Sequence, residues 1–179
     1  MGSPPGRSRS DGDSRRGYKN AAIVNSFYLM NVLNCFSICL PHFPYLYHSK
    51  FPMKNYNAYF IIPAEPSDIY AAITNPLTIR LWTGEEAIMS TEPGSEFSLW
   101  EGAICGKNIE FEENKKIVQQ WYFGDQEEAS IVTIKLHPHK QGTSVELRHS
   151  NIPDEAYDDI VDGWNENYMG SLVDFYGDE

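Results

Sequence analysis

The C-terminal segment that begins at Pro153 constrains the fold most, because it carries one broad apolar and aromatic stripe of helical period. Pro153 suits a first helical turn, where no N–H is needed, and Asp154 and Glu155 suit the positive end of the helix dipole. The stripe recurs at three- and four-residue spacing through Tyr157, Ile160, Val161, Trp164, Tyr168, Leu172 and Phe175. A helix of this length spans roughly 35 Å at 1.5 Å per residue. It therefore needs an equally large apolar surface to pack against.

Short alternating segments upstream supply the only candidate for that surface. The alternation over residues 55–62 predicts an opening strand, and proline-led segments predict short helices over 63–73 and 76–82. Turn signals then separate six more predicted strands, at residues 87–91, 96–100, 103–112, 116–123, 130–137 and 143–149. This order predicts an α+β domain: a curved antiparallel sheet of about six to seven strands, with two short helices after the first strand and a long C-terminal helix across it.

The first 52 residues differ in composition from the rest, so we divide the chain into a leader at 1–52 and one domain at 53–179. The leader is Gly/Ser/Pro/Arg-rich and then apolar, but asparagines interrupt the apolar run. Met53 stands directly before the first convincing strand, which favours an over-extended gene start or an unstructured leader. A signal with a twin-arginine-like Arg15-Arg16 pair and a membrane anchor remain as alternatives.

Charge and cysteine content bound the partners and the compartment. Residues 53–179 hold 8 basic against 23 acidic side chains, a net charge of −15. This disfavours nucleic-acid binding and is compatible with a basic partner or simply with solubility. Three cysteines make no framework of pairs, which indicates a reducing compartment. We expect a cytoplasmic protein with no nucleic-acid or membrane partner.

Several motifs resemble a known family. The segment from Glu65 to Pro76, followed by Arg80-Leu81-Trp82, is similar to the entry pattern of the SRPBCC superfamily of START-like, helix-grip domains. Further segments resemble the family related to the C-terminal domain of the activator of the ninety-kilodalton heat-shock chaperone ATPase; they are residues 94–99, 116–121, 143–153 and 163–164. The resemblance runs from about residue 54 to 175 and implies the helix-grip fold. Its bacterial members are functionally diverse, and many relatives carry tryptophan at the place of Leu81 and glycine at the place of Ser95.

Chemistry-bearing motifs are few. His137-Pro138-His139 has metal-like spacing but stands at a strand end without a Cys/His cluster nearby, which favours a solvated turn. A Cys105–His149 dyad would need both side chains adjacent in space and oriented by a third group. Paired acids such as Asp158-Asp159 point apart on regular elements. We therefore expect no catalytic residue, metal site or cofactor, and the sequence favours a non-enzymatic protein.

Aromatic side chains carry the functional hypothesis. Either they pack solidly between helix and sheet, or they line a cavity for a small, hydrophobic, preferably neutral ligand, as helix-grip domains enclose. The expected cavity residues are Trp82, Phe97, Trp121, Phe123, Trp164, Tyr168 and Phe175, with Arg80, Gln119, His149 and Tyr157 as polar handles. The family resemblance implies an alternative, a protein-interaction module that stimulates a chaperone ATPase. A lyase or hydrolase of the same superfamily comes third.

Overall fold

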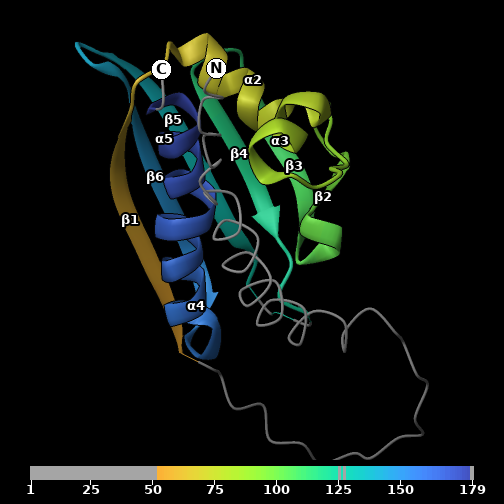
Figure 1. The fold of residues 1–179 in the computed structure, drawn as a ribbon. Coiled ribbons are helices and arrows are strands. Elements are labelled where there is room, and N and C mark those ends of the chain that lie inside the picture. Colours follow the sequence, from red (N-terminus) through yellow and green to blue (C-terminus); the bar gives the residue numbers. More distant parts are fainter. Residues whose placement is uncertain (1–51, 125, 127, 178–179) are drawn as a thin grey trace, which may run out of the picture.

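A six-stranded antiparallel sheet forms the body of the protein, in the strand order β1-β6-β5-β4-β3-β2. The structure, a computed structural model, describes residues 52–124, 126 and 128–177, so the expected leader lies outside the described residues except for Pro52. The strands are β1 (Met53–Ile62), β2 (Glu96–Leu99), β3 (Ile104–Glu112), β4 (Lys116–Trp121), β5 (Ser130–His139) and β6 (Gly142–Pro153). Figure 1 shows the sheet curving around the helix that ends the described chain.

Helices cover one face of this sheet. Two short helices, α2 (Pro66–Thr74) and α3 (Pro76–Thr83), follow β1 and lie beside the upper end of the sheet in Figure 1. The C-terminal helix, residues 154–177, consists of η2 (Asp154–Ala156), α4 (Tyr157–Asp162), η3 (Gly163–Tyr168) and α5 (Met169–Gly177). The remaining element is a single turn, η1 (Trp100–Gly102). The predicted α+β architecture, with a long C-terminal helix on a curved antiparallel sheet, is confirmed.

Local signals explain where the short helices begin and end. Pro66 begins α2, and the side chain of Asn75 accepts a hydrogen bond from the Leu77 N–H at 2.9 Å, which caps α3. Gly84 then ends α3 in the left-handed conformation, with φ of 79°. The first of these helices thus begins at Pro66, three residues later than the predicted start at 63.

The largest differences from the predicted elements concern residues 87–91 and Pro153. Residues 87–91 form no strand: only Ile88 bridges to Ser98, because the backbone of Ser90 is instead bound by the buried side chain of Asn108 at 2.9 Å. Pro153 does not begin the C-terminal helix, since β6 continues to Pro153 by pairing with Met53. The first helical turn starts one residue later, at Asp154, as a 3-10 turn.

The middle of the C-terminal helix is a π-helical turn that the sequence analysis did not anticipate. In η3 the N–H of Met169 bonds to the carbonyl of Trp164, five residues back. Asn165 supports this turn: its side-chain nitrogen donates to Val161 O at 2.8 Å, and its oxygen accepts from the Tyr56 hydroxyl at 2.9 Å. The widened turn is thereby tied to β1.

Candidate functional site: an aromatic cluster between helix and sheet

Seven rings meet between the C-terminal helix and the sheet, and we call them the aromatic cluster. They come from α3, η1, β4 and the segment after it, β6 and η3; the members are Trp82, Trp100, Trp121, Phe123, His149, Trp164 and Tyr168. Alternation places Trp121 and His149 on the inner face of their strands, and helical spacing places Trp164 and Tyr168 opposite them. The cluster thus joins five parts of the chain in one contact surface.

Ring-to-ring distances within the cluster are those of direct packing. Trp121 stacks on Trp164 with centroids 4.7 Å apart, and Tyr168 lies 4.8 Å from Trp164 and 5.2 Å from Trp82. Trp100 stands edge-on to Trp82 at 5.6 Å. Such pairs contribute about 0.5–1.5 kcal/mol each beyond their buried area. The rings of the cluster therefore contact one another directly between the helix and the sheet.

His149 lies at the centre of a complete hydrogen-bond chain. The indole N–H of Trp164 donates to His149 Nδ1 at 3.0 Å, and because an indole nitrogen can only donate, Nδ1 must be unprotonated. The proton of the neutral ring is therefore on Nε2, which lies 2.8 Å from Ser130 Oγ and donates to it. Ser130 in turn donates to Ser150 O at 3.1 Å. Every polar atom of the His149 ring is thus satisfied.

Burial determines the charge of the cluster's polar groups. The His149 side chain is 1% exposed, and its desolvation lowers the pKa of His149 to about 3, so the ring is neutral across the physiological range. Burial also raises the pKa of the Tyr168 hydroxyl, which therefore stays protonated. The Tyr168 ring packs against Trp82, Trp100 and Trp164.

Gln119 is buried and belongs to a second polar network. Its amide nitrogen donates to Asn108 Oδ1 at 2.9 Å, and its oxygen accepts from the Trp121 indole at 3.3 Å. Asn108 also donates to Ser95 Oγ at 3.1 Å. This network joins β3 and β4 to the segment before β2, so the expected handle has a structural role.

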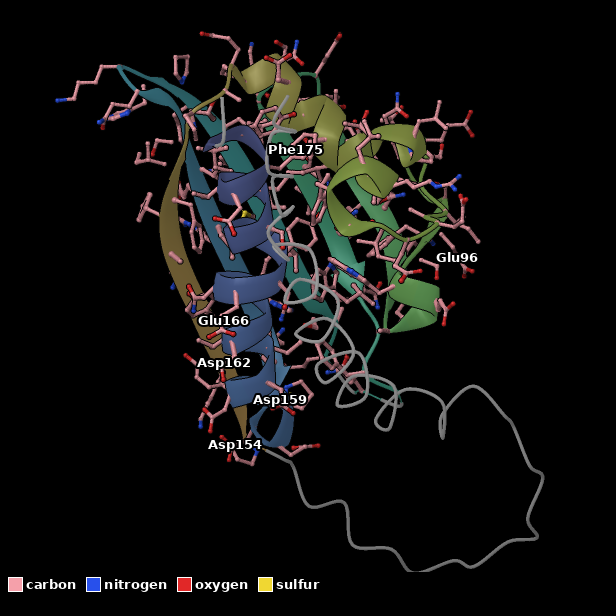
Figure 2. All side chains as sticks on the ribbon, viewed as in Figure 1. Glu96, Asp154, Asp159, Asp162, Glu166 and Phe175 are labelled. Carbon is pink, nitrogen blue, oxygen red and sulfur yellow. The ribbon has the colours of Figure 1, made fainter. Side chains whose placement is uncertain are left out.

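Of the other expected site residues, some lie in or near the core and others lie at the surface. Phe97 is buried in the core, and Phe123 is half-buried against it, 6.0 Å from the His149 ring. Phe175 was expected to face inward but is 39% exposed; Figure 2 shows it near α2, far along the C-terminal helix from Asp159. Arg80 lies on the exposed side of α3, where it pairs with Glu86 at 2.6 Å, and Tyr157 lies under the ammonium of Lys54 at 4.8 Å. The last three are therefore outside the aromatic cluster.

Trp100 and Ser130 were missed by the sequence analysis. Trp100 was predicted to end the strand at 96–100, but β2 ends at Leu99, and Trp100 has a φ of 48° with its ring against Trp82 and Tyr168. A left-handed conformation costs a bulky residue roughly 1–2 kcal/mol, so surrounding contacts must hold it. Glu101-Gly102 after it was the available signal, because glycine often accompanies such turns. Ser130 carried no signal of its own.

The described residues hold little that resembles a catalytic centre. Ser130 and His149 have the spacing of a nucleophile and a base, but the hydrogen bond runs from the imidazole to the hydroxyl, and the Trp164 indole occupies the other nitrogen. Cys105 is half-buried and makes no disulfide. His137 contacts Glu146 at 3.3 Å, and no group of three or more potential metal ligands occurs within the described ranges. In those same ranges, no helix has the length and apolar character of a membrane span.

Known proteins with similar sequences share this architecture. A solved structure described as an HSP90 activator from Plasmodium falciparum is 26% identical, with a TM-score of 0.63, and the match covers 70% of this chain and 97% of that one. The solution structure of the Aha1 dimer from Colwellia psychrerythraea matches in fold, with 22% identity and a TM-score of 0.57 over 69% of this chain and 94% of that one.

A curated relative from Dictyostelium discoideum, described as an activator of 90 kDa heat shock protein ATPase homolog, is 31% identical over 110 residues. That match covers 60% of this chain and 29% of the relative, so the chain spans less than a third of that protein's length. Residues 63–176 match the family described as activator of Hsp90 ATPase homolog 1-like protein. The matched region includes most of the sheet, both short helices and nearly all of the C-terminal helix, and the chain belongs to this family.

Proposed function

We propose that this domain is a protein-interaction module that binds a chaperone of the 90 kDa heat-shock class and raises its ATPase rate. The proposal draws on relatives that are described as activators of that chaperone, one of them matched over 97% of its length. Because the chain spans only part of the Dictyostelium relative, the activity of that whole protein is here an inference for one domain.

One structural observation favours binding of a partner at the outer surface over binding of a ligand in the interior. Two of the polar side chains expected to bind a ligand already make hydrogen bonds within the protein. His149 bonds to Trp164 and Ser130, and Gln119 bonds to Asn108 and Trp121. A ligand that used these groups would have to break hydrogen bonds already made in the interior, at a cost of about 1–3 kcal/mol for each group left unpaired.

Charge indicates the chemistry of the partner surface. Residues 53–179 carry a net charge of −15, and Figure 2 shows Asp159, Asp162 and Glu166 along the outer face of the C-terminal helix. These side chains are exposed. A basic surface on the chaperone would complement them and would accelerate association in a salt-dependent manner.

A chaperone ATPase assay tests the proposal. Full-length protein is titrated into the purified chaperone, and hydrolysis that resists a chaperone ATP-site inhibitor is subtracted. We expect the ATPase rate to rise with saturation, and the triple variant Asp159→Asn, Asp162→Asn, Glu166→Gln to require higher concentrations. Glu110→Gln with Glu112→Gln on β3 is the matched control. An unchanged ATPase rate together with no detectable binding would contradict the proposal.

Tyr168 supports a second candidate, the binding of a small neutral ligand at the aromatic cluster. Its hydroxyl is buried, and its ring adjoins Trp82 and Trp100. A ligand that makes a hydrogen bond to this hydroxyl would gain affinity there. A neutral ligand is favoured because Arg80, the expected cation at the mouth, is exposed and paired with Glu86.

Tryptophan fluorescence measures this binding. Neutral aromatic compounds should quench the emission, Trp164→Ala should change the response, and Tyr168→Phe, which removes only the hydroxyl, should weaken binding about fivefold, as expected for one hydrogen bond of about 1 kcal/mol. Arg80→Ala is the matched control and should leave the affinity unchanged. Tighter binding of carboxylates of similar size, or equal affinity of the Tyr168→Phe variant, would refute this candidate.

A further inference from the structure

The two edges of the sheet differ in how they are protected. β2 is only four residues long, and its outer side is occupied by the segment containing Ile88, whose N–H and carbonyl exchange hydrogen bonds with Ser98, each 2.9 Å long. β1 is ten residues long and pairs with β6 on one side. No other strand of the described chain pairs with its second side. Figure 1 shows β1 at the margin of the sheet.

β1 also lacks the usual devices that prevent edge pairing. Natural edge strands carry lysines, prolines, bulges or inward charges that block a second strand. In β1 the only charged residue is Lys54, and the irregularity in its pairing lies between Lys54 and Tyr56, at one end. From Tyr56 to Ile62 the register with β6 is continuous. This stretch presents a regular, uncharged edge.

The solvent face beside this edge is apolar. Tyr59 is 69% exposed and Ile61 is 41% exposed, and they follow one another on the outward side of the strand. Asn57 is the next residue on that face. Such side chains gain contact area when a neighbouring strand brings its own residues alongside.

We propose that the β1 edges of two copies of this chain pair antiparallel and join their sheets into one. An antiparallel pairing of a strand with itself is two-fold symmetric, so one segment supplies both halves of the interface. With the axis near Tyr59, the two Tyr59 rings become cross-strand neighbours, and Ile61 of each copy faces Asn57 of the other.

Charge favours a second copy over a foreign basic partner at this place. The rest of residues 53–179 is strongly acidic, but residues 55–62 carry no charge, so the edge offers nothing to select a cation. An uncharged stretch lets two acidic molecules approach with less local repulsion than a charged one would. Because only one strand edge is shared, the association is weak, with a dissociation constant in the micromolar range.

Sedimentation velocity on the full chain, from about 1 to 200 µM, tests the pairing. We expect a concentration-dependent dimer, and Ile61→Lys and Tyr59→Lys each to raise the dissociation constant at least tenfold. A lysine at 59 faces Glu146 across the β1–β6 pair, so that variant should remain folded. The matched control is Leu81→Lys, which alters a side chain 70% exposed on α3 and should leave the dimer unchanged.

Amide hydrogen exchange supplies an independent readout. Alternate amides of residues 55–61 should exchange more slowly at the higher protein concentration, and not in Ile61→Lys. A wild-type protein that stays monomeric over the whole range would overturn the proposal. So would a dimer that survives both β1 variants, or one that is lost in Leu81→Lys instead.

Discussion

Acidification should destabilise this protein through His149 in a way that can be separated from all other titrating groups. The neutral ring is held by Trp164 and Ser130, and burial lowers its pKa to about 3, whereas an unfolded histidine has a pKa of about 6.5. Between these two values the unfolded chain binds a proton at this residue and the folded chain does not. The neutral His149 ring therefore contributes its full stabilisation to the folded state above about pH 6.5. This contribution to the free energy of unfolding is lost as the pH falls toward 3.

The magnitude follows from the width of that window. Each pH unit inside it changes the free energy of unfolding by about 1.4 kcal/mol, so lowering the pH from about 7.5 to 5 should remove about 2 kcal/mol through His149 alone. Because small domains have total stabilities of about 5–15 kcal/mol, such a loss is readily measured.

Urea unfolding followed by tryptophan fluorescence at both pH values is the assay. The His149→Gln variant will be less stable overall, but its loss between the two pH values should be about 2 kcal/mol smaller than that of the wild type. Equal losses in wild type and His149→Gln would refute the assignment, as would a nitrogen NMR spectrum showing the His149 proton on Nδ1.

Three further outcomes follow from the packing. Gly170→Ala should destabilise the domain by about 1–3 kcal/mol in urea unfolding, because a Cβ there would lie 2.5 Å from Asn165 O. In an ordinary helix interior the same change would stabilise the protein. Gly177→Ala, with open space around it, is the control. Gly163→Leu should destabilise by overpacking and Gly163→Ala should be mild, since Gly163 is buried beside Trp164; unchanged stability of the leucine variant would mean that the site tolerates a large side chain. A chain shortened to residues 53–179 should melt within a degree or two of the full chain; a melting temperature lower by several degrees would mean that residues 1–52 stabilise the body.

Local signals in the sequence predicted most elements, because their causes are local. Asn75 before Pro76 and Gly84 after α3 act within one or two residues of themselves. The segment at 87–91 failed because a strand needs a neighbour along its whole length, and only Ile88 has one. The extension of β6 to Pro153 likewise depends on Met53, a hundred residues away in the sequence.

The sequence predicted several residues of the aromatic cluster but not the hydrogen bonds that they make. Periodicity identified Trp164 and Tyr168 as inward-facing, but it carries no information on which polar groups pair with which. His149 and Gln119 were therefore predicted to be available for a ligand, although they make hydrogen bonds with Trp164 and Asn108. The ligand reading of the whole set remains a prediction.

The π-helical turn at Gly163–Tyr168 has a consequence for how this family can change length. A π turn holds one residue more than the α-turn it replaces, so it behaves as a single-residue insertion in the C-terminal helix. Ile160 and Leu172 are both buried although they are twelve residues apart, a spacing that would turn them about 120° from one another in an unbroken α-helix. Deleting one residue in the turn, for example the exposed Glu166, would restore a regular helix and leave both side chains facing the sheet, because eleven residues of α-helix bring them within about 20° of the same direction. A relative that lacks the extra residue would therefore keep the same buried face, and an alignment with it needs a one-residue gap here.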